Sequence, residues 1–167
     1  GLPVCWDFDT LAALAGDGFR TLARERSYSI FGGDYTPVKR LGWSFLYSAQ
    51  GKTGVTVPLT GEAAVNPDIP GYALPFAMAH EMAHRLCIAR NDDADFSAFL
   101  ACSENDSLEY QYSGYFMAYR ICIAALDSVD EAAAATIREG ESDALALDLS
   151  ELGRFFDDNR DEDLTRL

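Results

Sequence analysis

The sequence predicts an α+β domain that is mostly helical and has a small β-sheet near its N-terminus. From Val38 to Thr60, aromatic and β-branched residues alternate with glycines, a pattern typical of short strands. Residues with helical spacing and helix-capping residues then continue almost to the C-terminus. The chain has 167 residues, 49% of them apolar and 12% aromatic. It is therefore long enough to bury a core as a single domain, residues 1–167, and too apolar to be disordered.

The N-terminal part is expected to contain one helix and two or three strands. Ala- and Leu-rich residues 6–26 predict the helix, with an interruption near Gly16. Residues 41–47 and 54–57 predict strands. Pro58 ends the second strand and suits only an edge position, because proline cannot donate to a neighbouring strand.

The remainder of the chain is expected to be a loop followed by helices. Residues 61–71 are rich in proline and glycine and predict the loop. Pro75 suits the first turn of a helix, Asn91 or Asp92 can cap the next helix, and Ser107 can cap a third. Helices are thus expected over residues 75–89, 93–103, 108–126, 130–138 and 142–156.

The charge balance restricts the partners of the chain. It has 27 acidic and 13 basic residues, a formal net charge of −14. Such acidity argues against a nucleic-acid partner, because phosphate binding requires clustered Lys and Arg. No apolar run reaches the roughly 18 residues of a membrane span, and no signal peptide is recognisable. The first residue is Gly1 and not Met, so we expect a fragment of a longer protein.

The four cysteines do not form a recognisable metal or redox motif. They are far apart in the sequence, and a chain of this length does not need disulfides in order to fold. We expect free thiols that are buried as small hydrophobic side chains. They are Cys5, Cys87, Cys102 and Cys122.

The only two histidines of the chain flank a glutamate in His80-Glu81-Met82-Ala83-His84. Residues four apart lie on one face of a helix, so both imidazoles can reach one metal ion. This is the pattern of zinc-dependent peptidases, in which zinc polarises the scissile carbonyl and activates water. We therefore expect Zn²⁺ on His80 and His84, with Glu81 as the general base and then the general acid.

A third protein ligand is expected from the acidic residues that begin the next helix, Asp92, Asp93 and Asp95. A helix–turn–helix fold-back would bring them beside His84. One carboxylate would complete the zinc site, and another would accept a hydrogen bond from a ligating imidazole. The alternative is a solvated helix N-terminus, where the helix dipole favours acids.

These motifs resemble a bacterial family catalogued as domain of unknown function 3810. The resemblance covers roughly residues 38 to 126. It rests on Thr53-Gly54, Pro58, Gly61-Glu62, Asn66, Leu74-Pro75-Phe76, the His80–His84 motif, Asp92–Phe96, Leu100-Ala101-Cys102 and Tyr112-Ser113-Gly114-Tyr115.

The resemblance implies a zincin-like metallopeptidase domain whose third ligand is acidic. Members are typically membrane proteins with transmembrane helices before the peptidase-like region. The chain is thus expected to be a soluble domain on the extracytoplasmic face, anchored by a segment outside it, with a peptide or protein substrate.

Two departures from the family pattern concern the site. The chain has Asp93-Ala94-Asp95 where the family usually has Glu-Ala-Asn, and Cys87 where it usually has Gly. Asp93 matches the family's Glu and is assigned to the metal, although it is shorter by about 1.5 Å. On a helix it lies about 200° from Asp95, so both cannot face the zinc. Asp95 is assigned to a hydrogen bond with a ligating imidazole.

Several alternatives remain open. The chain is a zinc peptidase, a non-catalytic metal-binding or regulatory domain of a membrane protein (a pseudopeptidase), or a helical interaction module without metal. The strand Val55–Val57 either binds an extended peptide at its edge or is an ordinary edge strand. Tyr112 or Tyr115 either donates to the oxyanion of the reaction or is a buried structural residue.

Overall fold

The computed structural model describes residues 6–159 of the chain. Within them it is mostly helical with a small three-stranded mixed sheet in the N-terminal half, as the sequence predicted. The described residues also contain two short 3₁₀ turns, η1 (Ser29–Phe31) and η2 (Gly71–Ala73). The elements are α1 (Phe8–Leu14), α2 (Asp17–Arg24), β1 (Lys39–Arg40), α3 (Ser44–Ala49), β2 (Gly54–Val57), β3 (Glu62–Val65), α4 (Leu74–Arg85), α5 (Asn91–Ser103), α6 (Leu108–Val129), α7 (Glu131–Arg138) and α8 (Asp143–Asn159).

The sheet has the strand order β1-β3-β2. β1 runs parallel to β3 and β2 runs antiparallel to it. β2 is therefore an edge strand, which confirms the position that Pro58 predicted. Ala63 and Val65 of the central strand have no exposed surface, so one face of the sheet is covered by the core.

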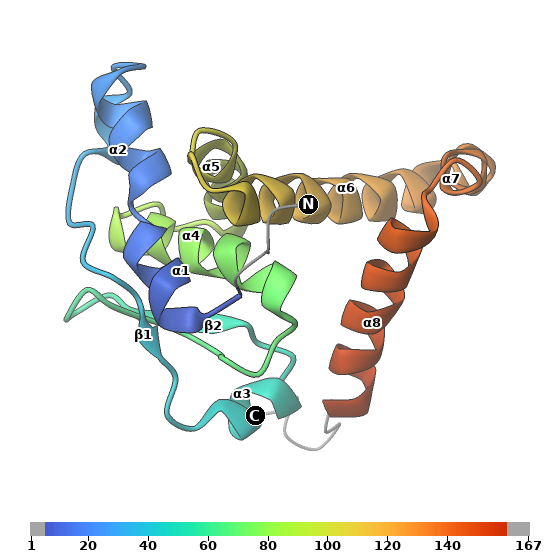
Figure 1. Cartoon of the computed structure of the whole chain (residues 1–167), viewed down its shortest axis with the longest axis horizontal. Helices are drawn as coiled ribbons and strands as arrows, with labels where there is room; N and C mark the ends of the chain where they lie inside the picture. Colours follow the sequence, from blue (N-terminus) through green and yellow to red (C-terminus); the bar gives the residue numbers. More distant parts are fainter. Residues whose placement is uncertain (1–5, 160–167) are drawn as a thin grey trace.

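α4 is the central helix of the molecule and packs between the sheet and helices α5 and α6 (Figure 1). Met78, Ala79, Met82 and Ala83 of this helix have no exposed surface. Ala94 and Ala98 of α5 are equally inaccessible, and such small residues allow two helices to approach closely. The interior position of α4 explains why its apolar residues are not confined to one stripe.

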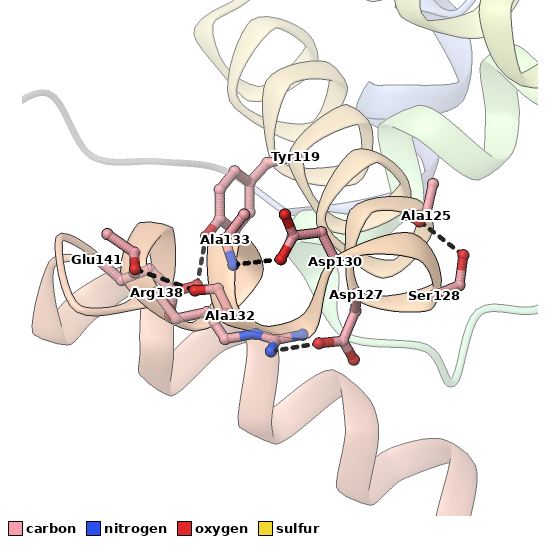
Figure 2. Close-up of polar contacts among 10 residues, drawn as sticks. Tyr119, Ala125, Asp127, Ser128, Asp130, Ala132, Ala133, Arg138 and Glu141 are labelled. Carbon is pink, nitrogen blue, oxygen red and sulfur yellow. Dashed lines mark hydrogen bonds and ion pairs between the residues drawn. The ribbon is translucent and has the colours of Figure 1, made fainter.

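Helices α6, α7 and α8 form one side of the molecule, with α8 returning from the far end of α6 toward α3 (Figure 1). The corner is fixed by polar contacts (Figure 2). Arg138 Nη1 donates to Asp127 Oδ1 at 2.9 Å, and the amide of Ala133 donates to Asp130 Oδ1 at 3.0 Å. The hydrogen bond from Arg138 lowers the pKa of the Asp127 carboxyl. After this corner the chain returns as α8, which contacts α3.

Two local predictions were wrong. Residues 44–49 form helix α3 instead of a strand, and Ser48 of this helix is buried and accepts a hydrogen bond from Asn66 Nδ2 at 2.7 Å. The aromatic residues of segment 44–49 favour a strand locally, but the contact of Ser48 with the distant Asn66 stabilises the helix. The expected loop 61–71 contains the central strand β3, whose Glu-Ala-Ala sequence has weak strand propensity and depends on pairing on both sides.

The predicted helices are present, with ends that differ by a few residues. The interruption near Gly16 is confirmed, because α1 ends at Leu14 and α2 begins at Asp17. Within residues 6–159, no helix combines the length and apolar character that crossing a membrane requires.

The cysteine prediction is confirmed in part. Cys87, Cys102 and Cys122 are free thiols. Cys102 is buried, and burial raises the pKa of its thiol. Cys87 and Cys122 are exposed, so the expected burial was wrong for them. Cys5 lies outside the described residues.

Candidate metal centre

The histidine motif lies in the C-terminal half of α4, as its spacing predicted. The helix begins with Pro75 in its first turn, and the amide of Phe76 donates to Ser113 Oγ of α6 at 3.0 Å. Successive turns bring the rings of His80 and His84 into contact, with their centroids 4.7 Å apart. Their Nε2 atoms are separated by 3.0 Å. The two imidazoles therefore converge on one point, as the i, i+4 spacing requires.

The other nitrogen of each ring is occupied by an acceptor. His80 Nδ1 lies 2.7 Å from Asp95 Oδ1, and His84 Nδ1 lies 2.7 Å from the carbonyl oxygen of Ile88. A carbonyl or an ionised carboxylate can only accept a hydrogen bond, so both Nδ1 atoms are donors. In the neutral rings the proton is thus on Nδ1, and each Nε2 carries a lone pair.

Two lone pairs that face each other at 3.0 Å repel unless a cation lies between them. That cation is either a proton on one ring or a metal ion. Zinc binds imidazole nitrogens at about 2.0–2.1 Å, so two nitrogens of a tetrahedral site are about 3.3 Å apart. Hydrogen bonds from Nδ1 to a carboxylate or a backbone carbonyl are the usual supports of ligating histidines. His80 and His84 therefore fit a zinc ion.

The end of α4 positions the carbonyl that holds His84. The amide of Cys87 donates to the His84 carbonyl at 3.0 Å, and the amide of Ile88 donates to the Ala83 carbonyl at 3.1 Å. This pair of bonds is the Schellman motif, which requires a left-handed residue after the helix. Cys87 has φ 68°, in the left-handed region that favours glycine.

Glu81 lies beside the histidines and is only 5% exposed. Thr56 Oγ1 on β2 is 2.7 Å from Glu81 Oε2 and 3.0 Å from the Glu81 carbonyl oxygen. Burial raises the pKa of the Glu81 carboxyl, while the Thr56 hydrogen bond and the nearby His80 and His84 oppose this shift. A raised pKa makes a carboxylate a stronger base, which suits a group that takes up a proton and then returns it.

The acidic residues of α5 are divided between the site and the solvent. Asp95 makes the predicted hydrogen bond with an imidazole of the motif. Asp93 has an exposed side chain, with Oδ2 3.8 Å from Arg90 Nε, and is not brought to the histidines. The two residues are about 200° apart around the helix, and Asp95 faces α4. Among residues 6–159, no group of three His, Cys, Asp or Glu side chains is placed to hold a metal.

Two cavities meet at His80. One, of about 420 Å³, is bounded by residues 51–56 and Pro58 and by His80, Glu81, His84 and Asn91. The other, of about 400 Å³, extends from His80 and Asp95 toward α6 and α8 and includes Arg120. Neither includes Tyr112 or Tyr115.

The two tyrosines lie on α6, where Tyr115 contacts Phe99 of α5 and Tyr112 contacts α8. Both side chains are exposed, so the expectation of buried structural tyrosines was wrong for them. The Tyr112 hydroxyl donates to Asp148 of α8.

The sequence assigns no individual role to Gly54, although it lies within the motifs that resemble the family, and it places Thr56 only in the strand Val55–Val57. A Cβ at Gly54 would lie 2.7 Å from both Cγ and Oε1 of Glu81, so only glycine leaves room for that carboxylate. The proximity of β2 to Glu81 depends on the packing of α4 on the sheet, which no local pattern reveals.

Comparison with known proteins identifies one family. The family described as "Protein of unknown function (DUF3810)" matches residues 6–166. No curated protein and no solved structure matched the chain. Since the match extends over nearly the whole sequence, this chain belongs to the DUF3810 family of proteins of unknown function.

Proposed function

We propose that this chain is a zincin-like, zinc-dependent peptidase domain. The observation that carries the proposal is the convergence of two Nε2 atoms at 3.0 Å while both Nδ1 atoms are held by acceptors. His80 and His84 would hold the zinc through Nε2. When bound, zinc polarises a carbonyl oxygen and makes water more acidic.

Glu81 would act as the general base and then as the general acid. Its carboxylate accepts a proton from the attacking water and returns it to the nitrogen of the leaving amine. Three observations support this role: the carboxyl is buried, its pKa is raised by that burial, and it borders the same cavity as both histidines. Thr56 holds Oε2 in place, which leaves Oε1 to accept the proton.

The substrate would be a peptide lying along β2. Among the described residues 6–159 this strand pairs with β3 alone, and its residues Gly54 to Thr56 border the cavity that contains Glu81. An extended peptide can add to such an edge through main-chain hydrogen bonds. The adjoining cavity of about 400 Å³, bounded in part by Phe76, Met117 and Phe156, would receive a side chain.

The resemblance supports a location at the membrane. We propose that the chain is attached by a segment outside it and lies on the extracytoplasmic face. Protease accessibility of the domain in intact cells, compared with lysed cells, tests the face.

A specific observation favours a second candidate, a non-catalytic metal-binding or regulatory domain. Asp93, which corresponds to the acidic ligand of the family, faces solvent beside Arg90. A site with two imidazoles and no carboxylate would bind zinc more weakly than a three-ligand site. Such a domain would bind metal without hydrolysing peptides.

Metal analysis and a cleavage assay separate the candidates. Protein purified without chelators or nickel resin is expected to contain about one zinc per chain, and H84A is expected to contain none. Full zinc content in H84A would contradict the site. E81Q is expected to keep the metal and to lose peptide-library cleavage, because an amide cannot accept the proton. Zinc binding with no cleavage by the wild type would favour the second candidate.

A further inference from the structure

The first turn of α5 brings one uncharged polar residue, Asn91, close to His80 and His84. Asn91 is the first residue of the helix, and it borders the 420 Å³ cavity together with His80, Glu81 and His84. Asp95 lies four residues later and contacts His80 Nδ1 at 2.7 Å. Residues four apart share a helix face, so Asn91 and Asp95 both face α4.

The neighbouring acids are not candidates for the same position. Asp92 Oδ2 lies 3.5 Å from Arg90 Nη2, and Asp93 Oδ2 lies 3.8 Å from Arg90 Nε. Their side chains are 88% and 64% exposed, respectively. Neither borders the two cavities that meet at His80.

We infer that Asn91 occupies the position of the third metal-coordinating side chain, where a carboxylate would complete the site. This inference rests on the proposed metal site. The amide oxygen of Asn is an uncharged metal ligand, whereas the carboxylate of Asp or Glu would contribute a negative charge. The zinc ligands of this chain would therefore be two imidazoles and one uncharged amide oxygen. Such a site would bind zinc with lower affinity than a site with two histidines and one carboxylate.

The position can accept an acid without loss of the helix. Asn91 is exposed, and an acid in the first turn of a helix is stabilised by the helix dipole. N91D and N91E are therefore expected to fold like the wild type, which circular dichroism and the unfolding midpoint can verify.

The experiment is a zinc titration with a chromophoric chelator as competitor. N91D or N91E is expected to tighten zinc binding by at least about tenfold. The matched acid-removal control, D93N, is expected to leave the affinity unchanged. Cobalt substituted into N91E is expected to show a visible spectrum different from that of the wild type, because a ligand has changed.

The outcomes separate this inference from the proposed function. If H84A binds zinc as tightly as the wild type, the proposed site itself fails. If H84A loses zinc but neither N91D nor N91E tightens binding, the site stands and the assignment of Asn91 is overturned. Weakened binding in D93N would overturn it as well and return the ligand role to Asp93.

Discussion

Gly54 of β2 leaves the space that the carboxylate of Glu81 occupies. A Cβ at this position would approach Glu81 Oε1 to 2.7 Å and the backbone oxygen of Ala64 to 2.9 Å. The first contact involves a side chain that can move, whereas the second involves the central strand of the sheet. The identity of residue 54 therefore determines both where Glu81 lies and how closely β2 approaches β3.

G54A is expected to displace Glu81 and to destabilise the sheet by about 1–3 kcal/mol, the usual cost of an overpacked interior. Urea unfolding gives the stability, and zinc titration gives the state of the site. Zinc binding should persist, because Glu81 is not a proposed ligand, while any cleavage activity should fall. G42A is the control, since a Cβ at Gly42 meets nothing within 4 Å. Equal stability of G54A and G42A would contradict the argument.

The hydrogen bond between Asp95 and His80 is expected to support metal binding. D95A removes the acceptor of His80 Nδ1, so the ring loses its fixed orientation and tautomer. Zinc affinity should fall about 10- to 100-fold, as is usual when such a support is lost. D92N is the control, because Asp92 pairs with Arg90 away from the site. Equal zinc affinity of D95A and the wild type would show that His80 needs no support.

The sequence was sufficient for the histidine motif and insufficient for its partners. His80, Glu81 and His84 lie on one continuous helix, so their spacing alone predicts that they meet. The third position depends on how α5 docks against α4. A shift of two residues turns a side chain about 200° around the helix, which is why Asp93 faces solvent and Asp95 faces His80. Once Asp95 is known to face α4, the same geometry identifies Asn91.

The sheet also shows that local sequence does not predict structure that depends on contacts between distant residues. Val55–Val57 has β-branched residues and a terminating Pro58, and it forms the predicted edge strand. The central strand, Glu62–Val65, has weak strand propensity and exists because it pairs on both sides. Local propensity thus predicts the edge of this sheet better than its centre.

The ion pair at the corner between α6 and α7 is expected to give a pH-dependent contribution to stability. Arg138 lowers the pKa of Asp127 below its ordinary 3.8, so the folded chain binds this proton less readily than the unfolded chain does. The contribution is therefore complete above the ordinary pKa and is lost as the pH falls through the lower folded value. Since both side chains are about two-fifths exposed, the effect should be small.

D127N tests this relationship. Its Tm should lie below that of the wild type at neutral pH, and the difference should shrink as the pH falls below the ordinary pKa of 3.8. R138Q should produce a similar loss, and the double variant should lose less than the sum of the two. A difference between D127N and the wild type that does not change with pH would contradict the ion pair.

Cys87 links the stability of the chain to the geometry of its site. Its left-handed φ of 68° allows Ile88 to donate to the Ala83 carbonyl and thereby aims the Ile88 carbonyl at His84. A side chain in this conformation is strained by about 1–2 kcal/mol, and glycine removes the strain. C87G should therefore be more stable than the wild type by about 1 kcal/mol, after the larger chain entropy of unfolded glycine is subtracted.

C87A separates the strain from the loss of the thiol. Alanine lacks the sulfur but keeps the Cβ, so it should give no comparable gain in the urea midpoint. Because C87G retains the backbone path to Ile88, it should also retain zinc affinity. If C87G and C87A were equally stable, the left-handed residue would not be the source of strain. Weaker zinc binding in C87G would mean that the cysteine side chain, and not the backbone turn, holds the Ile88 carbonyl toward His84.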